Sequence, residues 1–400
     1  MQHMVRSDLS QLPAYVPGKA LPDALRVASN ETAEAPLPAV TDAIADAAAR
    51  ANRYPDMGVM KLREELAAWL SRSPGAPTLT KDNVIVGNGS SALCLQAIQS
   101  TCMGGDEVVF PWRSFEAYPI LAQIAGAKPV AVPLNVEHAV DLDAMLAAVN
   151  DRTRVVFVCN PNNPTGTTVA EEQLVAFLEA VPERVAVILD EAYIEYDRSN
   201  FSGGGAGHTA GGGADHAASA AGAGEVSEVD EVNCAAGALA SVNSLPLLER
   251  FPNLAICRTF SKAYGLAGLR LGYLVAQPEF ITAMSKVAIP FGVNALAQVA
   301  GLASISDASQ KQLNTRVEET IEERSRVLAN LPEELHVPSQ TNFVWLPVGD
   351  RAADLDAALQ DEGVTARAFT GEGVRVTVTN HAEVDKLLPA LQQALKVVGY

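Results

Sequence analysis

Two apolar runs that lead into polar side chains set the architecture of this 400-residue chain. Val155–Val158 is followed closely by Asn160, and Val185–Leu189 leads directly into Asp190. Short continuous apolar runs are typical of strands that are buried on both faces of a parallel sheet. Because segments of helical periodicity alternate with such strands, we expect an α/β fold with a mostly parallel central sheet flanked by helices.

The polar residues after these strands are candidate ligand-binding groups, because open α/β sheets bind ligands at the carboxyl ends of their strands. A carboxylate at Asp190 could keep the nitrogen of a pyridine ring protonated and so make the ring an electron sink. Tyr193 could reach a phenolic oxygen on that ring. Asp190 could equally be a helix N-cap. Asn163 could donate to the same phenolic oxygen, but Asn-Pro and Thr-Gly pairs are also common in plain turns.

Lys262 lies in an unusual setting for a lysine, within Ser-Lys-Ala-Tyr-Gly-Leu-Ala-Gly-Leu-Arg at 261–270. Most lysines lie on the surface, but this one has apolar and glycine neighbours and follows an apolar strand over 254–257. An amine that must form a Schiff base with an aldehyde cofactor needs such a setting. Ser261 and Arg270 could hold a phosphate of that cofactor, and the glycines allow the backbone to approach it.

A turn rich in glycine and serine spans residues 87–91 and precedes an expected helix over 92–100. The amide groups at a helix N-terminus, together with the positive end of its dipole, form a ready anion site. Gly89, Ser90 and Ser91 are therefore candidate phosphate ligands. The turn lacks the Gly-Lys-Ser/Thr of a P-loop and the full GxGxxG pattern, which disfavours a nicotinamide-dependent dehydrogenase.

The order of these motifs resembles that of the fold-type I pyridoxal-phosphate aminotransferases of class I and II. Supporting matches lie over residues 29–32, 53–56, 89–91 and 373–377. The resemblance is closest to the histidinol-phosphate aminotransferase branch, which includes the actinobacterial aromatic (phenylalanine) aminotransferases. It implies a large cofactor-binding domain, a smaller α+β C-terminal domain and pyridoxal 5'-phosphate as the cofactor.

The resemblance also implies a role for each site residue. Lys262 would hold the cofactor and move the substrate proton, and Asp190 would face the ring nitrogen. The remaining cofactor ligands would be Phe115 stacked on the ring, Asn163 and Tyr193 at the phenolic oxygen, and Gly89, Ser90, Ser91, Ser261 and Arg270 at the phosphate. Tyr54 would reach the phosphate of the neighbouring subunit, so we expect a homodimer with shared sites.

Substrate binding is assigned in the same way. Arg375 would clamp the substrate carboxylate, a task that a planar guanidinium performs well, although a surface charge on a strand is the alternative. Asn30, Arg367 and Tyr15 would be the other substrate-binding residues.

The amino donor is open between two candidates. The stretches 112–118 and 367–373 favour an aromatic amino acid, whose ring would lie against Phe369 and Tyr15. Arg367 would instead suit the phosphate of histidinol phosphate, the donor of a histidine-biosynthesis enzyme. In either case 2-oxoglutarate is the expected acceptor of a ping-pong cycle. A decarboxylase or lyase on the same scaffold, or a non-catalytic pyridoxal-phosphate binding protein, are further alternatives.

The length of the chain exceeds that of one hydrophobic core, so we expect more than one domain. We expect an N-terminal arm over 1–35, a large domain over 36–280 and a small domain over 281–400. The segment 202–240 is rich in glycine and alanine and reads as a flexible surface insertion. Its two histidines, His208 and His216, lack further ligands at a suitable spacing, so we expect no metal site.

Composition narrows the class of partner and the compartment. The net charge of −18 argues against nucleic acid or an anionic membrane as the main partner. The five cysteines form no CxxC pair and are typical of a reducing compartment. No apolar run approaches the length of a membrane span, and we expect a cytoplasmic enzyme that acts on small molecules.

Overall fold

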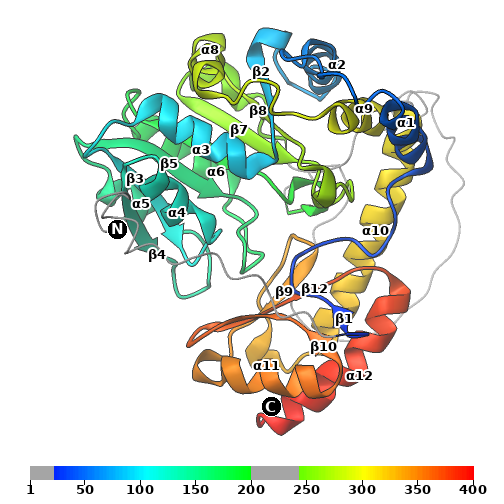
Figure 1. Cartoon of the computed structure of the whole chain (residues 1–400). Helices are drawn as coiled ribbons and strands as arrows, with labels where there is room; N and C mark the ends of the chain where they lie inside the picture. The colour runs from blue at the N-terminus through cyan, green and yellow to red at the C-terminus, as the bar shows by residue number, and fades with distance from the viewer. Residues whose placement is uncertain (1–21, 200–242) are drawn as a thin grey trace, which may run out of the picture.

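The computed structural model describes residues 22–199 and 243–400. Figure 1 shows two lobes, an upper one around a large sheet and a lower one around a small sheet, joined by the long helix α10 (Asp307–Ala329). Tyr15 and the predicted insertion over 202–240 lie outside the described residues.

The large sheet has seven strands in the order β2-β8-β7-β6-β5-β3-β4. Neighbouring strands are parallel except at β8, which runs antiparallel to both β7 and β2. The predicted α/β fold with a mostly parallel sheet is confirmed. The strands are β2 (Val84–Gly87), β3 (Glu107–Trp112), β4 (Lys128–Pro133), β5 (Thr153–Cys159), β6 (Ala186–Asp190), β7 (Leu254–Thr259) and β8 (Gly272–Val275).

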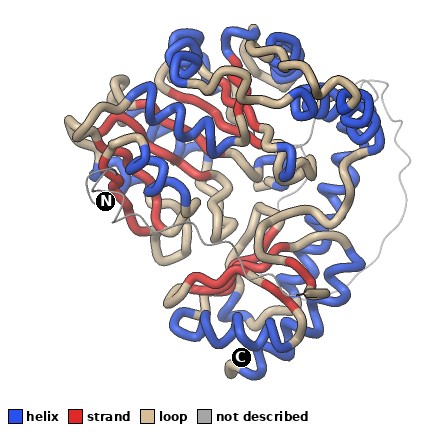
Figure 2. The backbone as a smooth tube through the Cα atoms, in the orientation of Figure 1, coloured by secondary structure: helices blue, strands red, loops and turns tan. Residues whose placement is uncertain are grey.

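Both faces of the large sheet are buried, which explains the continuous apolar runs. Along β5, Val155 and Phe157 lie in one hydrophobic core, and Val156 and Val158 lie in the core on the opposite face. Helices α3, α4 and α8 contribute to the first core, and α5 and α6 contribute to the second. Figure 2 shows helices packed around the strands of the large sheet. The helices before α10 are α1 (Pro38–Ala48), α2 (Met60–Leu70), α3 (Ser90–Thr101), α4 (Ala117–Ile124), α5 (Leu142–Ala148), α6 (Glu171–Ala180), α7 (Leu247–Arg250), α8 (Pro278–Val287) and α9 (Ala295–Ser304).

The small lobe contains an antiparallel sheet of three strands in the order β11-β12-β9. Two further short strands, β1 (Leu25–Arg26) and β10 (Val364–Thr365), pair in parallel, so the start of the described chain belongs to this lobe. The other elements of the lobe are β9 (Phe343–Leu346), α11 (Ala352–Asp361), β11 (Arg367–Phe369), β12 (Gly373–Thr377) and α12 (His381–Val397).

The hydrophobic cores show how the lobes are connected. Leu313 and Val317 of α10 lie in the core of the large sheet, whereas Val327 of the same helix lies in the core of the small lobe. α9 also packs into the large core, and Val27 packs into the small one. The predicted domain boundaries at 35/36 and 280/281 stay predictions.

Two elements differ from the sequence-based expectation. The alternating charges of residues 316–328 predict a helix over that range, but α10 begins earlier, at Asp307, where the Ser306 side chain accepts a hydrogen bond from the Ser309 amide and caps the first turn. Residues 365–368 are predicted from the sequence to form one short strand, but the structure divides it at Ala366, because β10 pairs with β1 and β11 pairs with β12. In the described part of the chain, no helix combines the length and the apolar character needed to cross a bilayer.

Candidate functional site

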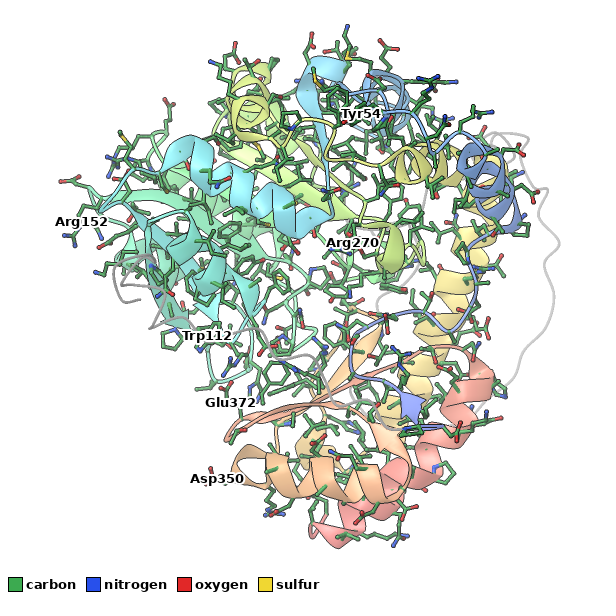
Figure 3. The ribbon with its side chains drawn as sticks, in the orientation of Figure 1. Tyr54, Trp112, Arg152, Arg270, Asp350 and Glu372 are labelled. Carbon is green, nitrogen blue, oxygen red and sulfur yellow. The ribbon has the colours of Figure 1, made fainter. Side chains whose placement is uncertain are left out.

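A cavity of about 590 Å³ lies where the two lobes meet. Its walls come from the carboxyl ends of β5, β6 and β7, the start of α3, the segment after β1, and strands β11 and β12. Arg270, labelled in Figure 3, marks the side of the large lobe that faces the small one. Most predicted site residues line this cavity: Asn30, Ser90, Ser91, Phe115, Asn163, Asp190, Tyr193, Ser261, Lys262, Arg270, Arg367 and Arg375.

Lys262 follows β7, and its side chain enters the cavity. The Nζ atom donates a hydrogen bond to the Ser29 carbonyl oxygen at 2.9 Å and lies 5.9 Å from the centroid of the Tyr193 ring. Burial lowers the pKa of Lys262 to about 7, and the positive charges of Arg375 and Arg270 lower it further against the attraction of Glu31. A large share of this amine is therefore neutral near pH 7, the form that attacks a carbonyl carbon.

Asp190 ends β6 and is only 3% exposed. The Tyr118 hydroxyl donates to its Oδ2 atom at 2.6 Å, whereas Oδ1 is buried and accepts no hydrogen bond from the described residues. Burial raises the pKa of Asp190 to about 6, although the Tyr118 hydrogen bond opposes this effect. A buried carboxylate oxygen without a donor is costly, so the cavity presents an acceptor that a protonated ring nitrogen would satisfy.

A hydrogen-bonded network surrounds Tyr193. Asn30 Nδ2 donates to the Tyr193 hydroxyl at 2.8 Å, and burial raises the pKa of Tyr193 to about 12. The Asn30 amide donates to Thr377 Oγ1 at 3.0 Å, which ties this segment to β12. Asn163 Oδ1 accepts from Arg375 Nη1 at 2.5 Å. Tyr193 and Asn163 are both expected at the phenolic oxygen of the cofactor. Each is thus hydrogen-bonded to a predicted substrate-binding residue, Tyr193 to Asn30 and Asn163 to Arg375.

The end of the cavity near α3 is suited to an anion. Ser90 and Ser91 are the first two residues of the helix, and Gly89 precedes them with φ of +78°. This φ strains any residue that has a Cβ atom, and a Cβ at Gly89 would also lie 2.6 Å from Arg270 Nη2 and displace that side chain. Arg270 Nη1 donates to Ser261 Oγ at 3.3 Å. A helix N-terminus, three serines and a guanidinium therefore converge, as a phosphate requires.

The small lobe contributes a pair of arginines. Arg367 on β11 lies directly opposite Arg375 on β12 in the antiparallel register, so both side chains leave the same face of the sheet. Arg375 is 7% exposed and donates to the Ala28 carbonyl oxygen as well as to Asn163. Arg367 Nη2 donates to Glu116 Oε2 at 2.8 Å, across the boundary between the lobes.

Four predicted residues are not among those that line the cavity. Phe369, expected beside the substrate ring, is buried against Trp345 instead, with ring centroids 5.5 Å apart. Gly89 is adjacent to it through Arg270, as described above. Tyr54 lies far from it at the outer surface of the large lobe (Figure 3), where its side chain is 83% exposed and its ring rests on Phe291 with centroids 4.7 Å apart. Tyr15 lies outside the described residues. Among the described residues, no group of three or more His, Cys, Asp or Glu side chains is arranged to hold a metal ion.

Several contacts of the site were missed by sequence reasoning. Tyr118 binds Asp190 from a position 72 residues away, and Glu116 binds Arg367 from 251 residues away. Arg113 and Glu372 form a second ion pair between the lobes; in Figure 3, Glu372 lies below Trp112, the residue before Arg113. All three large-lobe residues belong to the stretch 112–118, whose mixture of aromatic and charged residues is the one indication that the sequence offers.

Comparisons with known proteins agree with this geometry. The family model described as "Aminotransferase class I and II" matches residues 22–391. An aromatic amino acid aminotransferase of Corynebacterium jeikeium is 52% identical over 404 residues, which cover 99% of this chain and 95% of that protein. One of Rhodococcus jostii is 46% identical over 390 residues, 97% of this chain and 95% of the relative. The structure of histidinol-phosphate aminotransferase from Sinorhizobium meliloti, in complex with pyridoxal-5'-phosphate, superposes with a TM-score of 0.78 at 26% identity and 99% coverage of both chains.

Proposed function

Because the chain belongs to the class I and II aminotransferases, we propose that it transfers the amino group of an aromatic L-amino acid to a 2-oxo acid, with pyridoxal 5'-phosphate as its cofactor. Several relatives with 44–52% identity over nearly the whole chain are named aromatic amino acid aminotransferases. The cavity supports the proposal because its residues match the cofactor group by group.

The residues that would hold the cofactor are those that line the cavity in the large lobe. Lys262 would bond to the aldehyde carbon, and the buried Oδ1 of Asp190 would accept from the ring nitrogen. Asn163 and Tyr193 would hold the phenolic oxygen, and Phe115 would lie against the ring. The phosphate ligands would be the backbone and side chains of Gly89, Ser90 and Ser91, with Ser261 and Arg270. When bound, pyridoxal phosphate supplies an electron sink for the electrons of the broken Cα–H bond.

Lys262 would also act as the general base. Its Nζ atom would take the proton from the substrate Cα and later return one. The depressed pKa of Lys262, about 7 in the cofactor-free cavity, suits this exchange because the neutral and charged forms are similar in free energy near neutral pH.

Arg375 and Arg367 would orient the substrate. Arg375 is fixed by Asn163 and Ala28 and would bind the α-carboxylate, with Asn30 beside it. Beyond them, Phe115, Ala117 and Ile120 line the cavity and offer an apolar wall to a phenyl ring. We propose 2-oxoglutarate as the acceptor, with its distal carboxylate near Arg367. Tyr15 is proposed as a further wall of the same pocket.

A homodimer is part of this proposal. Tyr54 is largely exposed, and Met57, Ile289 and Phe291 nearby in sequence or space are exposed as well, with 61%, 73% and 41% of their area accessible. Exposed apolar groups gathered in this way mark a surface for another protein. With this surface covered by a second copy, Tyr54 would reach the neighbouring subunit's phosphate site. We also propose a cytoplasmic location, on the basis of the cysteine pattern.

One observation carries the proposal: Lys262, Asp190 and Arg375 line the same cavity, and the buried Oδ1 atom of Asp190 accepts no hydrogen bond from the described residues. The test assays phenylalanine and histidinol phosphate side by side, with 2-oxoglutarate as the acceptor. We expect phenylalanine to be preferred by more than about tenfold in kcat/KM. A smaller preference would overturn the aromatic assignment, and a preference for histidinol phosphate would assign the chain to that reaction instead.

A further inference from the structure

Glu116 is a carboxylate that lines the cavity but has no part in the phosphate site or in the role proposed for Lys262. It precedes the first residue of α4 in the large lobe, lines the cavity and accepts a hydrogen bond from Arg367 Nη2 of the small lobe at 2.8 Å. Both side chains are mostly covered, with exposed fractions of 30% and 18%. The pair therefore meets at the place where a substrate side chain must lie.

The two arginines of the small sheet explain why a carboxylate is needed there. Arg367 and Arg375 are cross-strand neighbours, and like charges in that arrangement repel. Asn163 and Ala28 hold Arg375 where it would bind the α-carboxylate of the substrate. Glu116 compensates the charge of Arg367, so the distal end of the cavity carries a neutral ion pair beside the apolar side chains of Phe115, Ala117 and Ile120.

From this arrangement we propose that Glu116 sets the balance between the two substrates at the distal end of the cavity: it weakens the binding of an acidic side chain, such as that of 2-oxoglutarate, relative to a neutral apolar one. This inference rests on the proposed transamination. A phenyl side chain leaves the Glu116–Arg367 pair intact and packs beside it. A side chain that ends in a carboxylate meets the negative charge of Glu116 and gains Arg367 only by separating the pair. Glu116 thus competes with every acidic ligand for the same guanidinium.

The test removes the negative charge of Glu116 and keeps the shape of its side chain. Glu116→Gln retains an oxygen that accepts from Arg367 but removes the negative charge. Glu372→Gln is the matched control, because Glu372 also binds an arginine across the lobes, Arg113, but does not line the cavity. Binding of two unreactive acids to the holoenzyme is measured by titration calorimetry: glutarate, which has a distal carboxylate, and 3-phenylpropionate, which has a phenyl ring.

In Glu116→Gln we expect glutarate to bind about tenfold more tightly, because the repulsion between its distal carboxylate and the charge of Glu116 is gone. The affinity of Glu116→Gln for 3-phenylpropionate should differ from that of the wild type by less than about twofold. In Glu372→Gln the affinities for both ligands should stay within the same range. A glutarate-to-phenylpropionate affinity ratio in Glu116→Gln that stays within twofold of the wild-type ratio overturns the inference, as does an equal rise in Glu372→Gln.

A second measurement ties the effect to Arg367. In an Arg367→Gln background, Glu116→Gln should no longer tighten glutarate binding, since the guanidinium for which the two carboxylates compete is absent. Steady-state kinetics with phenylalanine and glutamate as donors separate the two proposals. A wild-type enzyme that transaminates neither donor contradicts the proposed function. An active wild-type enzyme whose donor preference is unmoved by Glu116→Gln contradicts only the role of Glu116.

Discussion

The Tyr118 hydroxyl fixes the orientation of Asp190 by donating to Oδ2 at 2.6 Å. The Tyr118 ring is itself held by stacking on Phe157 of β5, with centroids 4.5 Å apart and an angle of 15° between the planes. One carboxylate oxygen is thereby occupied, and the other is left for the cavity. The acid expected to face the cofactor is thus positioned by Tyr118, whose ring also makes an edge contact with Phe115 in the cavity wall.

Tyr118→Phe should weaken cofactor binding and lower activity without unfolding the protein, because the ring and its packing remain. A hydrogen bond to a charged group contributes about 1.5–3 kcal/mol, so we expect kcat/KM to fall by about tenfold to one hundredfold. Its loss also raises the pKa of Asp190 further above its ordinary value in the cofactor-free protein. In an Asp190→Asn background the same substitution should have no further effect; an additive loss would contradict the positioning role.

Lys262→Ala should abolish transamination, with a loss of at least about 10³-fold, because both the bond to the cofactor and the general base are removed. Borohydride treatment of the wild-type holoenzyme, followed by peptide mapping, should place the pyridoxyl label on Lys262. The exposed Lys286 of α8 provides the control, and Lys286→Ala should keep both activity and label. A label on any other lysine would refute the assignment.

Arg375→Lys should raise KM for the amino acid far more than it lowers kcat, since a lysine keeps the charge but cannot bind a carboxylate with two parallel hydrogen bonds. We expect an increase of about tenfold or more. The measurement is a steady-state series over the amino donor and then over the 2-oxo acid. Equal changes for the two substrates are expected because each presents the same carboxylate. An unchanged KM for both would rule out the clamp.

Glu195 should make the protein less stable as the pH rises. Its carboxyl group is buried, and burial raises its pKa to about 7, although the positive charge of Arg258 opposes this effect. The folded protein therefore binds this proton more tightly than the unfolded chain does, and stability is lost between about pH 4.5 and pH 7. Over that pH range, the free energy of unfolding of Glu195→Gln should rise by up to about 3 kcal/mol relative to that of the wild type.

Urea unfolding from pH 4.5 to pH 8 checks this prediction. The stability gap between Glu195→Gln and the wild type should widen with pH and level off above pH 7. Glu322→Gln, at an exposed position on α10, should stay within about 0.5 kcal/mol of the wild type throughout. A gap for Glu195→Gln that is independent of pH would show that the carboxyl group does not titrate in this range.

Tyr54→Ala and Lys262→Ala should complement each other when mixed. Each homodimer alone lacks a group in both of its sites, but a mixed dimer has one site with both groups intact. Random exchange of subunits in a twofold dimer would restore about a quarter of wild-type activity. The two variants are mixed at a denaturant concentration that allows subunits to exchange, and transaminase activity is then measured. No recovery, with exchange verified by a tagged subunit, would remove Tyr54 from the neighbouring site.

The sequence predicted those parts of the site that lie next to a strand. Asp190, Asn163 and Lys262 each follow an apolar strand within a few residues, and the carboxyl ends of parallel strands meet at one edge of the sheet. The contacts of Glu116 and Tyr118 were not predictable in this way, because they depend on the start of α4 and on how the lobes pack. The spacing of eight positions from Arg367 to Arg375 likewise does not reveal that a tight turn places the two directly opposite each other.

The fold followed a similar rule. Strands with both faces buried were recognisable from their composition, whereas the first turns of α10 were not, since Asp307–Asn314 is mostly polar and its cap is a single serine side chain. The division of the 365–368 strand also depends on a distant partner, β1, near the other end of the chain.

The two residues of β1 belong to the small lobe, yet Ser29, three residues further on, holds the amine of Lys262 in the large lobe. The lysine is therefore tethered to a segment that travels with the opposite half of the molecule. Any movement of the small lobe away from the large one would therefore draw Ser29 away from the amine and lengthen this hydrogen bond.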